Sequence, residues 1–485
     1  MNSFPKITFC TGVGTVTGAN FLLEVSSKTK ILIDCGMVQG EKFATAENRE
    51  PFSYDISSIT ALFITHAHLD HVGRIPKLVK DGYKGPIYST PETQALAEVV
   101  LNDAVNILKE EADREGVSPL YDASDVQQVF PLWKTVNYHE PFKLNDEVSI
   151  YLKDAGHILG SAMIEVTLLN GATGADSGSP LAHSALTGTT SGRSQTKILF
   201  TGDLGNSPAP LLRDTEAVGD VDYLVMESVY GDRNHEDREG RTNKFKQVIE
   251  RTIARGGTLI IPAFAIDRTQ VLLYELNNMV EKGVIPSIPI FVDSPMAIKA
   301  TDIYKTGEHL FNNFVQAQIR AGDDIFKFPR LKYTVSQNQS QEIDNAKPPK
   351  IILAGSGMSV GGRVVGHEEQ YLPDGRNTVL LVGYQTTGSL GRQLVDGLKK
   401  VHIHRKTIKV KAHIETLFGY SAHKDGDHLV QFVSTAGDEK GKGRLKKVFT
   451  VMGEPGASMH LAQRINDELG VKALVPNRGE IYRLE

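Results

Sequence analysis

The chain has 485 residues, 40% of them hydrophobic, so it is long enough to form two or three well-packed domains. It contains no apolar run of about 18 residues, and we therefore expect a soluble protein with no membrane span. A formal net charge of -5 at pH 7 excludes the broad basic surface of a nonspecific nucleic-acid-binding protein. Nucleic acid is still open as a substrate, because metal ions and a few arginines can hold phosphates on an acidic protein.

The two cysteines, Cys10 and Cys35, are too few for a disulfide scaffold, and each lies in an apolar, strand-like run. We therefore predict two buried free thiols, which fits a reducing cytoplasm. The first residues, Met1 to Lys6, lead straight into a strand, so we expect no secretion signal and a cytoplasmic location.

Residues 7–35 are typical of strands separated by glycine turns. The stretch from Gly12 to Gly18 superficially resembles a phosphate-binding loop, but it lacks the Gly-Lys-Ser/Thr ending, so hairpin turns explain it better. Asp34 closes the last of these strands beside a glycine. Two interpretations of Asp34 stay open: a turn-capping aspartate, or a side chain that supports a neighbouring site.

The stretch that follows residues 59–64 carries three imidazoles and a carboxylate within seven residues, Thr65-His66-Ala67-His68-Leu69-Asp70-His71. The preceding apolar run predicts a buried strand, and the residues from Val72 onward look like a helix, so these side chains lie in a strand-to-helix turn. Imidazole and carboxylate groups suit zinc and similar divalent ions. Two such ions can share an activated hydroxide for attack on phosphorus or on a carbonyl carbon.

The chain then continues with alternating helices and strands. Residues 91–109 have the pattern of a long amphipathic helix with Thr90 as its cap, and residues 148–152 that of a strand. His157 follows this strand at a glycine-flanked exit, from which a ligand can point into a cleft, although a lone histidine in such a place is more often structural.

Residues 170–196 are rich in Gly, Ser, Thr and Ala and contain almost no large apolar side chains, so we predict a mobile surface loop there. The strand at 197–200 ends in Thr-Gly-Asp-Leu-Gly. Its aspartate, Asp203, stands at the carboxyl end of a strand and is well placed to project into a crevice.

A second domain is expected from about Leu211, because residues 222–300 alternate as strand, helix, strand, helix, strand, beginning with a strand at 223–227. This alternation predicts a parallel sheet with helices on both faces. A further strand at 350–354 leads into the glycine-rich stretch 355–363. The character of the chain changes after about residue 405.

The motifs along nearly the whole chain resemble, in order, those of the metallo-β-lactamase superfamily and of its β-CASP nuclease family. The superfamily motifs are the stretch from His66 to His71, His157 in Gly-His-Ile-Leu-Gly-Ser, and Asp203 in Thr-Gly-Asp-Leu-Gly. The β-CASP motifs are Glu227 in Glu-Ser-Val-Tyr-Gly-Asp, the Gly355–Arg363 loop, Gly383-Tyr384-Gln385 and Ser421-Ala422-His423. This family includes bacterial RNA-processing nucleases and the endonuclease of messenger-RNA 3′-end cleavage.

The resemblance implies an α/β protein, a metallo-β-lactamase αββα sandwich with an inserted doubly wound parallel α/β domain, the β-CASP domain. Its expected boundaries are 1–210 for the first part of the metallo-β-lactamase domain, 211–405 for the β-CASP domain, and 406–485 for a C-terminal segment that completes the first domain.

The resemblance also implies the metal ligands. His66, His68 and His157 would hold a first zinc ion, Asp70 and His71 a second, and Asp203 would bridge the two. Asp34 would support a ligand from behind. The family's RNA-cleaving members usually carry Val-His-Gly-Glu near the end, and its histidine completes the second metal site; here Met452 stands in its place. A thioether is a ligand that zinc seldom takes, so we expect a weaker second site without Met452.

The catalytic residues implied by the resemblance are Asp70, Asp203, Glu227 and His423, with Glu227 orienting His423 as the general acid. Substrate contacts are implied for the glycine-rich loop and its surroundings, at Ser356, Gly357, Met358, Arg363, Arg392 and His423.

Several further basic and polar residues allow more than one interpretation. Arg268, Lys299 and Arg363 are candidates for phosphate contacts, although each taken singly is typical of a solvent-exposed charge. His402 and His404 alternate along a strand and are typical of a solvated face. Asp267, in Phe-Ala-Ile-Asp-Arg, stands where the family usually has glycine.

The expected function is therefore zinc-dependent cleavage of single-stranded RNA by attack of a metal-activated hydroxide, with His423 protonating the departing oxygen. Alternatives are a DNA nuclease of the same family, since DNA-processing members also lack the histidine that Met452 replaces, and a metal-depleted subunit that only binds RNA. A thioesterase on the same scaffold would not need Glu227 and His423. No membrane partner is expected, and a homodimer is left open.

Overall fold

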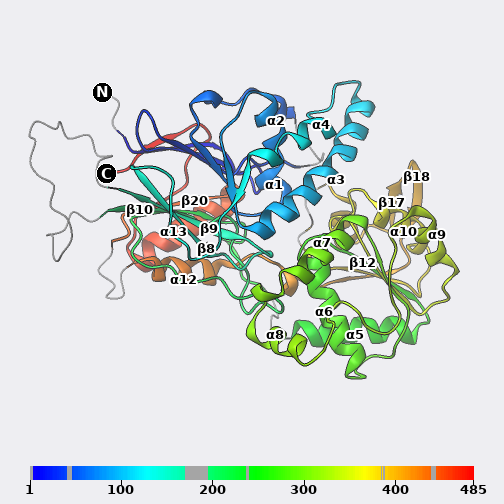
Figure 1. The fold of residues 1–485 in the computed structure, drawn as a ribbon. Helices are drawn as coiled ribbons and strands as arrows, with labels where there is room; N and C mark the ends of the chain where they lie inside the picture. Colours follow the sequence, from blue (N-terminus) through cyan, green and yellow to red (C-terminus); the bar gives the residue numbers. More distant parts are fainter. Residues whose placement is uncertain are drawn as a thin grey trace, which may run out of the picture.

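The computed structural model of the protein describes residues 4–40, 46–169, 195–235, 240–383, 385, 388–437 and 444–485. Figure 1 shows two domains side by side, and both ends of the chain lie in the same one. The loop expected at 170–196 lies outside the described residues, apart from its last two positions. Within the described ranges, no helix combines the length and the apolar character that crossing a membrane requires.

Two seven-stranded sheets form the first domain. The first sheet has the spatial order β22 (Ile481–Arg483), β1 (Lys6–Thr11), β2 (Asn20–Glu24), β3 (Lys30–Ile33), β4 (Ala61–Phe63), β5 (Ile87–Ser89) and β6 (Trp133–Thr135). The second has the order β21 (Ala473–Leu474), β20 (Lys447–Val451), β11 (Tyr223–Glu227), β10 (Thr196–Phe200), β9 (Ala162–Leu168), β8 (Val148–Asp154) and β7 (Phe142–Lys143).

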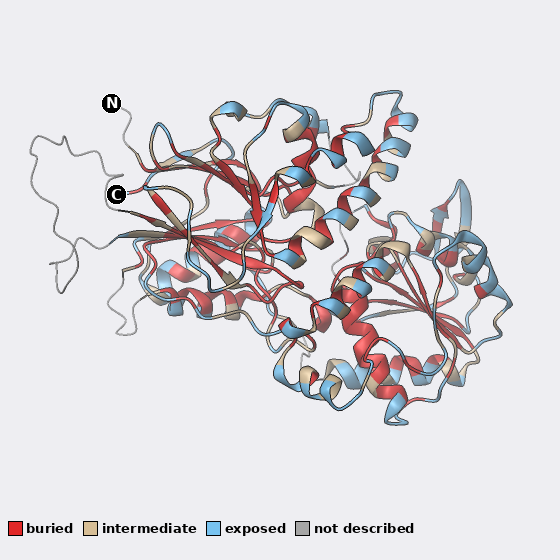
Figure 2. Ribbon diagram, viewed as in Figure 1, coloured by how far each residue is buried: buried red, intermediate tan, exposed pale blue. Residues whose placement is uncertain are grey.

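The core between these sheets is apolar and rich in aromatic rings. Phe9 and Phe21 of the first sheet meet Phe449 and Phe200 of the second, with ring centroids 5.1 Å apart for Phe9 and Phe449 and 6.4 Å for Phe21 and Phe200. Figure 2 shows this layer of buried residues. Burial of such large side chains is a main source of stability for the sandwich.

Helices cover the outer faces of both sheets (Figure 1). On the first sheet lie α1 (Leu69–Val72), α2 (Ile75–Lys80), α3 (Pro91–Glu115) and α4 (Ala123–Gln127), and on the second lie α12 (Gly426–Ala436) and α13 (Pro455–Leu469). The result is the expected αββα sandwich. Cys10 and Cys35 are buried free thiols in it, as predicted.

The long helix α3 begins where the sequence predicted. Pro91 occupies its first turn, and the Thr90 hydroxyl accepts a hydrogen bond from the Thr93 backbone N–H at 3.2 Å. The helix extends past the predicted end at Lys109 and stops at Gly116, which has a positive φ of 68°. Thr90 also donates to the Gly160 carbonyl at 2.7 Å, so the helix start anchors the loop that carries His157.

The second domain contains a six-stranded, entirely parallel sheet, with helices packed against both faces (Figure 1). Its spatial order is β14 (Leu331–Tyr333), β13 (Ile290–Asp293), β15 (Lys350–Ala354), β12 (Thr258–Pro262), β16 (Thr378–Leu381) and β19 (His413–Thr416). A small antiparallel ribbon adds β17 (Lys400–Ile403) and β18 (Lys406–Lys409). The helices are α5 (Arg241–Ala254), α6 (Arg268–Glu281), α7 (Pro295–Thr306), α8 (Asn313–Arg320), α9 (Gln337–Glu342), α10 (Arg363–Tyr371) and α11 (Leu390–Val395).

One predicted strand belongs to a different sheet. The strand at 223–227 was expected to start the parallel series of the second domain, but β11 pairs with β10 and β20 in the first domain. That expectation was wrong because alternation of strands and helices does not reveal which sheet a strand joins. At the other end, β19 joins the six-stranded sheet although it lies beyond residue 405.

The two domains share an apolar interface. Helices α3 and α7 pack together, and the Tyr304 hydroxyl of α7 accepts a hydrogen bond from the Leu159 N–H at 3.1 Å. Leu159 lies two residues after His157, so the second domain directly holds the loop that carries this histidine.

The double role of Thr90 predicts the effect of its replacement. Thr90→Ala removes the helix cap and the bond to Gly160, so the free energy of unfolding should fall by about 1–2 kcal/mol, measured by urea denaturation. Thr90→Ser keeps the hydroxyl and should behave like the unchanged protein. An alanine variant as stable as the serine variant would contradict this account of the helix start.

Candidate metal centre and acid-base pair

The polar residues singled out in the sequence converge at one edge of the sandwich. His66 and His68 follow β4, His157 lies between β8 and β9, Asp203 follows β10, and Glu227 ends β11. Three groups of side chains form there, each with its potential ligand atoms within 4.8 Å of one another. The groups are His66, His68, His157 with Asp203; Asp70, His71 with Asp203; and Asp203, Glu227 with His423.

In the first group, three imidazole nitrogens point at one place. The Nδ1 atom of His68 lies 3.1 Å from Nε2 of His66 and 3.2 Å from Nε2 of His157. Asp203 Oδ2 lies 3.4 Å from the His66 nitrogen and 3.6 Å from the His157 nitrogen. Burial lowers the pKa of His68 and of His157 well below the ordinary value, so both imidazoles are neutral and able to bind a metal at neutral pH.

The second group uses the other oxygen of the same carboxylate. His71 Nε2 lies 3.4 Å from Asp203 Oδ1 and 3.8 Å from Asp70 Oδ2. Burial by itself lowers the pKa of His71, but the carboxylates of Asp203, Asp34 and Asp70 outweigh it and raise that pKa well above its usual value. This position is therefore one that strongly favours positive charge.

Two buried atoms at this place fit a bound cation. His71 Nε2 and Asp203 Oδ1 are both shielded from water and have no hydrogen-bond partner in the described part of the chain. Buried polar atoms without partners are rare, because each loses its hydration without compensation. A divalent ion between imidazole and carboxylate ligands would satisfy both atoms.

Asp34 orients His71 from behind. Its Oδ2 accepts hydrogen bonds from His71 Nδ1 and from the Thr65 hydroxyl, both at 2.8 Å, and its Oδ1 accepts from the Thr65 backbone N–H at 2.8 Å. With Nδ1 donating to Asp34, Nε2 is the His71 atom that faces Asp203 and that could bind a metal ion in place of its proton. Gly36 is required nearby, since a Cβ atom on it would lie 1.5 Å from the Asp70 carbonyl oxygen.

His423 and Glu227 form an ion pair beside the candidate metal ligands. His423 Nδ1 lies 3.2 Å from Glu227 Oε1 and 3.9 Å from Asp203 Oδ2. Burial alone lowers the pKa of His423, but the adjacent Glu227 carboxylate raises it to about 9. Glu227 is itself held by the Leu204 N–H at 2.7 Å, so the pair is fixed to the segment that carries Asp203. A protonated imidazole at neutral pH is the result.

Met452 packs in the core of the sandwich. Its side chain is buried among the apolar residues between the two sheets, and a Cβ atom on Gly12 would lie 2.9 Å from its sulfur. The second group therefore offers Asp70, His71 and Asp203, the three residues that the sequence suggested would remain.

The predicted substrate loop lies at the carboxyl end of β15, in the second domain. The Gln385 side chain donates to the Gly357 carbonyl at 3.0 Å, and the Gly391 N–H donates to the Met358 carbonyl at 3.4 Å. The Val360 N–H donates to the Ser356 hydroxyl at 3.1 Å. These contacts hold the loop in place, and whether Ser356, Gly357 and Met358 touch substrate stays a prediction.

The two arginines predicted to bind substrate have protein partners. Arg363 donates to Asp293 at 2.7 Å and to two carbonyl oxygens, those of Thr334 and Val335. Arg392 donates at 2.9 Å to Asp396, the residue that follows the same helix. In this structure Arg363 ties its loop to the sheet, so its contact with RNA also stays a prediction.

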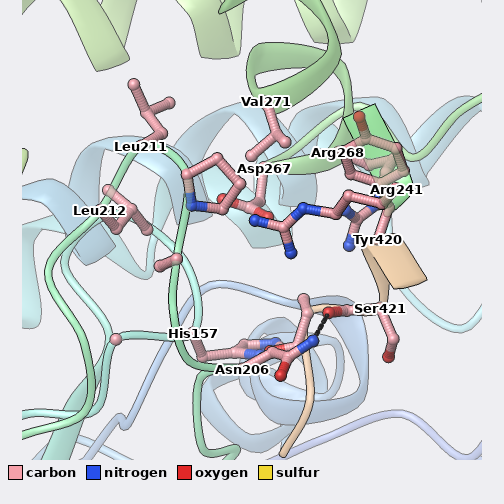
Figure 3. A pocket seen from close by; sticks show the side chains of 14 residues that line it. His157, Asn206, Leu211, Leu212, Arg241, Asp267, Arg268, Val271, Tyr420 and Ser421 are labelled. Atoms are coloured by element: carbon pink, nitrogen blue, oxygen red, sulfur yellow. Dashed lines mark hydrogen bonds between the residues drawn. The ribbon is translucent and has the colours of Figure 1, made fainter. Parts of the chain in front are cut away.

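A pocket between the domains is lined by residues that the sequence alone did not reveal or placed wrongly. Figure 3 shows His157 and Asn206 on one side and Arg241, Asp267 and Arg268 on the other. Arg268 is only 7% exposed, so its interpretation as a solvent-exposed charge was wrong. Arg241 belongs to no motif, and only the folded chain places it beside the metal centre.

Fold and site together define a metal-dependent hydrolase of the metallo-β-lactamase type. Comparison with known families agrees: residues 22–170 match the metallo-beta-lactamase superfamily domain, residues 269–394 the Beta-Casp domain, and residues 407–476 the Zn-dependent metallo-hydrolase RNA specificity domain. The chain therefore belongs to the β-CASP family of metal-dependent nucleases, as its motifs predicted.

Curated relatives match almost the full length of the chain. Ribonuclease TTHA0252 of Thermus thermophilus is 33% identical over 418 residues, covering 86% of this chain and 88% of its own. Transcription termination factor FttA of Pyrococcus abyssi is 31% identical over 493 residues, covering 98% of this chain and 71% of its own. A solved structure of a protein of unknown function from Enterococcus faecalis V583 has a TM-score of 0.54 and 13% identity, covers 99% of this chain and 100% of its own, and supports the fold alone.

The role of Asp34 can be tested through metal binding. Asp34→Asn weakens the orientation of His71, so the affinity of one of two metal sites should fall roughly ten- to a hundredfold, measured by calorimetric titration of the metal-free protein. Asp220→Asn is a matched control, because Asp220 also has a positive φ but lies at the surface, paired with Arg444. Equal metal affinity in the two variants would refute the supporting role of Asp34.

Proposed function

We propose that this protein is a zinc-dependent ribonuclease that cleaves single-stranded RNA. The observation that carries the proposal is the convergence of six metal-ligand candidates and a protonated His423 at one edge of the sandwich. The match to an RNA specificity domain and the ribonuclease relative support RNA as the substrate. The relatives named as transcription termination factors agree with a substrate made of RNA.

The donor set supports zinc as the metal. His66, His68 and His157 with Asp203 would hold one ion, and Asp70 and His71 with the other oxygen of Asp203 a second. Nitrogen and carboxylate ligands of this kind suit zinc, and three protein ligands leave the second site the weaker of the two. Two such ions, when bound, would supply an activated water and would neutralise charge on the phosphate oxygens.

The chain's own residues supply the proton for the leaving group. With Nδ1 of His423 paired to Glu227, the second proton of the imidazolium is on Nε2. His423 is also partly exposed, with 24% of its side chain accessible, so this proton is available to the oxygen that departs from phosphorus. Glu227 keeps the imidazole charged and oriented.

The second domain would place the RNA. We include in the proposal that Ser356, Gly357, Met358, Arg363 and Arg392 face the substrate from this domain. The loop's internal hydrogen bonds support a preformed surface. RNA would then lie between the two domains, with the bond to be cleaved at the metal ligands.

Replacing a metal ligand tests the function. His68→Ala should lose at least about a hundredfold in cleavage of single-stranded RNA labelled at both ends, with reduced zinc content measured by elemental analysis on the same sample. His402→Ala, on the exposed face of β17, is the matched control and should cleave normally. DNA of the same sequence, digested in parallel, tests the alternative that the protein is a DNA nuclease. Full RNA cleavage by His68→Ala would overturn the proposal. A wild-type preparation whose cleavage does not increase on addition of zinc or manganese would favour a subunit that only binds RNA.

The pH dependence of cleavage should report the acid-base pair. Glu227→Gln removes the charge that holds a proton on His423, and burial then lowers the pKa of the imidazole. The alkaline limb of the profile of kcat/KM against pH should therefore move to lower pH by about one unit or more. Glu98→Gln, at an exposed position of α3, serves as the control. Superimposable profiles for wild type and Glu227→Gln would remove His423 from the role of acid.

A further inference from the structure

The pocket between the domains lies directly beside the proposed metal ligands, since His157 forms part of its wall. Asn206 and Ser421 also line the side of His157, and Arg241, Asp267 and Arg268 lie on the opposite side (Figure 3). The mechanism described above uses neither arginine.

Arg268 is a buried cation without a direct partner. Its side chain is 7% exposed, and within the described residues its guanidinium forms no hydrogen bond or ion pair. Burial lowers the pKa of Arg268, but a guanidinium remains charged at neutral pH. A buried charge without a partner is costly, so the arrangement is suited to an anion that enters the pocket.

Arg241 adds a second cation to the same wall. Its guanidinium lies 5.4 Å from the centre of the Tyr420 ring and donates to the carbonyls of Gly419 at 3.3 Å and Pro208 at 3.2 Å. These contacts hold the group in place and leave further N–H donors for a ligand. Two neighbouring guanidinium groups repel each other, and a bound anion relieves that repulsion.

The backbone before Arg268 is strained in a way that directs its side chain. Asp267 has φ 65° and ψ -58°, and the Arg268 N–H donates to the Ile266 carbonyl at 2.9 Å, which makes a tight γ-turn with positive φ. This turn places Arg268 at the first residue of α6, a helix of 14 residues. The positive end of the helix dipole therefore adds to the charge of the pocket.

We propose that Arg241 and Arg268 bind a phosphate of the RNA backbone close to the phosphate that is cleaved, and so set where the strand lies in the metal centre. This rests on the proposed function. Arginine forks match phosphate oxygens in two-point contacts, and the shared wall with His157 places the bound phosphate within a short stretch of backbone from the cleaved bond. Asp267 moderates the positive charge of the pocket, since its carboxylate opposes the effect of burial on the pKa of Arg268.

The test removes one charge from the RNA and one from the protein, separately and together. A series of single-stranded RNA oligonucleotides carries one uncharged methylphosphonate at a time, at each position around the cleaved bond. For wild type with zinc, one position near that bond should lower kcat/KM about tenfold, mainly through KM. Arg268→Met should lose about tenfold on unmodified RNA and show no further loss at that position. The slope of log affinity against log salt should also fall by about 0.7.

Matched variants separate binding from folding. Arg320→Met, at an exposed position of α8, should retain both the rate and the sensitive position. Arg268→Lys keeps a charge and should recover part of the loss, and Arg241→Met provides the same test should Arg268→Met fail to fold. A sensitive position that persists in folded Arg268→Met and Arg241→Met, or a wild type with none, would overturn the proposal.

Binding measurements distinguish this proposal from the proposed function. Fluorescence anisotropy with the same oligonucleotides measures RNA affinity, so it tests the pocket even if wild type cleaves no RNA. Absence of cleavage would overturn only the proposed ribonuclease activity. Inorganic phosphate that inhibits wild type but not Arg268→Met, together with a flat methylphosphonate series, would assign the pocket to free phosphate and would also overturn the proposal.

Discussion

The single carboxylate of Asp203 is the interaction on which the rest of the site depends. Its Oδ2 atom faces the imidazoles of His66 and His157, its Oδ1 atom faces His71, and His423 approaches it from a third side. The pKa of Asp203 is held well below its usual value, because the neighbouring His71 and His66 outweigh the effect of burial. One negative charge thus lies next to two groups of potential metal ligands and next to His423, and its position after a strand keeps all of them at one edge.

The fold explains why these groups stay in register. Strands β10 and β11 run parallel and adjacent, so Asp203 and Glu227 emerge at the same edge of one sheet. The segment with His423 is joined to the segment with Asp203, since the Asn206 N–H donates to the Ala422 carbonyl at 2.8 Å. The second domain contacts the same edge in two ways: Tyr304 bonds to the loop that carries His157, and Arg241 and Arg268 line the pocket beside this histidine.

Much of this could be predicted from sequence. The stretch from His66 to His71 concentrates ligand types in a strand-to-helix turn, and His157 and Asp203 each follow a strand beside glycines, so local patterns were enough to find them. The family and the fold class were confirmed by the comparisons and the structure. The buried state of the thiols was also correctly predicted.

The errors have a common physical origin. The sheet that β11 joins and the burial of Arg268 depend on contacts between residues far apart in the chain, which periodicity cannot report. Arg363 shows the same limit, because its partner Asp293 lies 70 positions away in the sequence. A charged residue next to a motif can pair with another residue of the protein or contact the substrate, and only the folded chain shows which groups lie beside it.

The chain leaves the sandwich soon after Glu227 and returns shortly before His423, so a contact of 3.2 Å closes an excursion of 196 positions. The entropic cost of closing such an excursion grows only slowly with its length. Whole segments of the excursion can therefore be lengthened, shortened or replaced while His423 and its counter-ion Glu227 remain together. The inserted domain can therefore vary without separating His423 from Glu227.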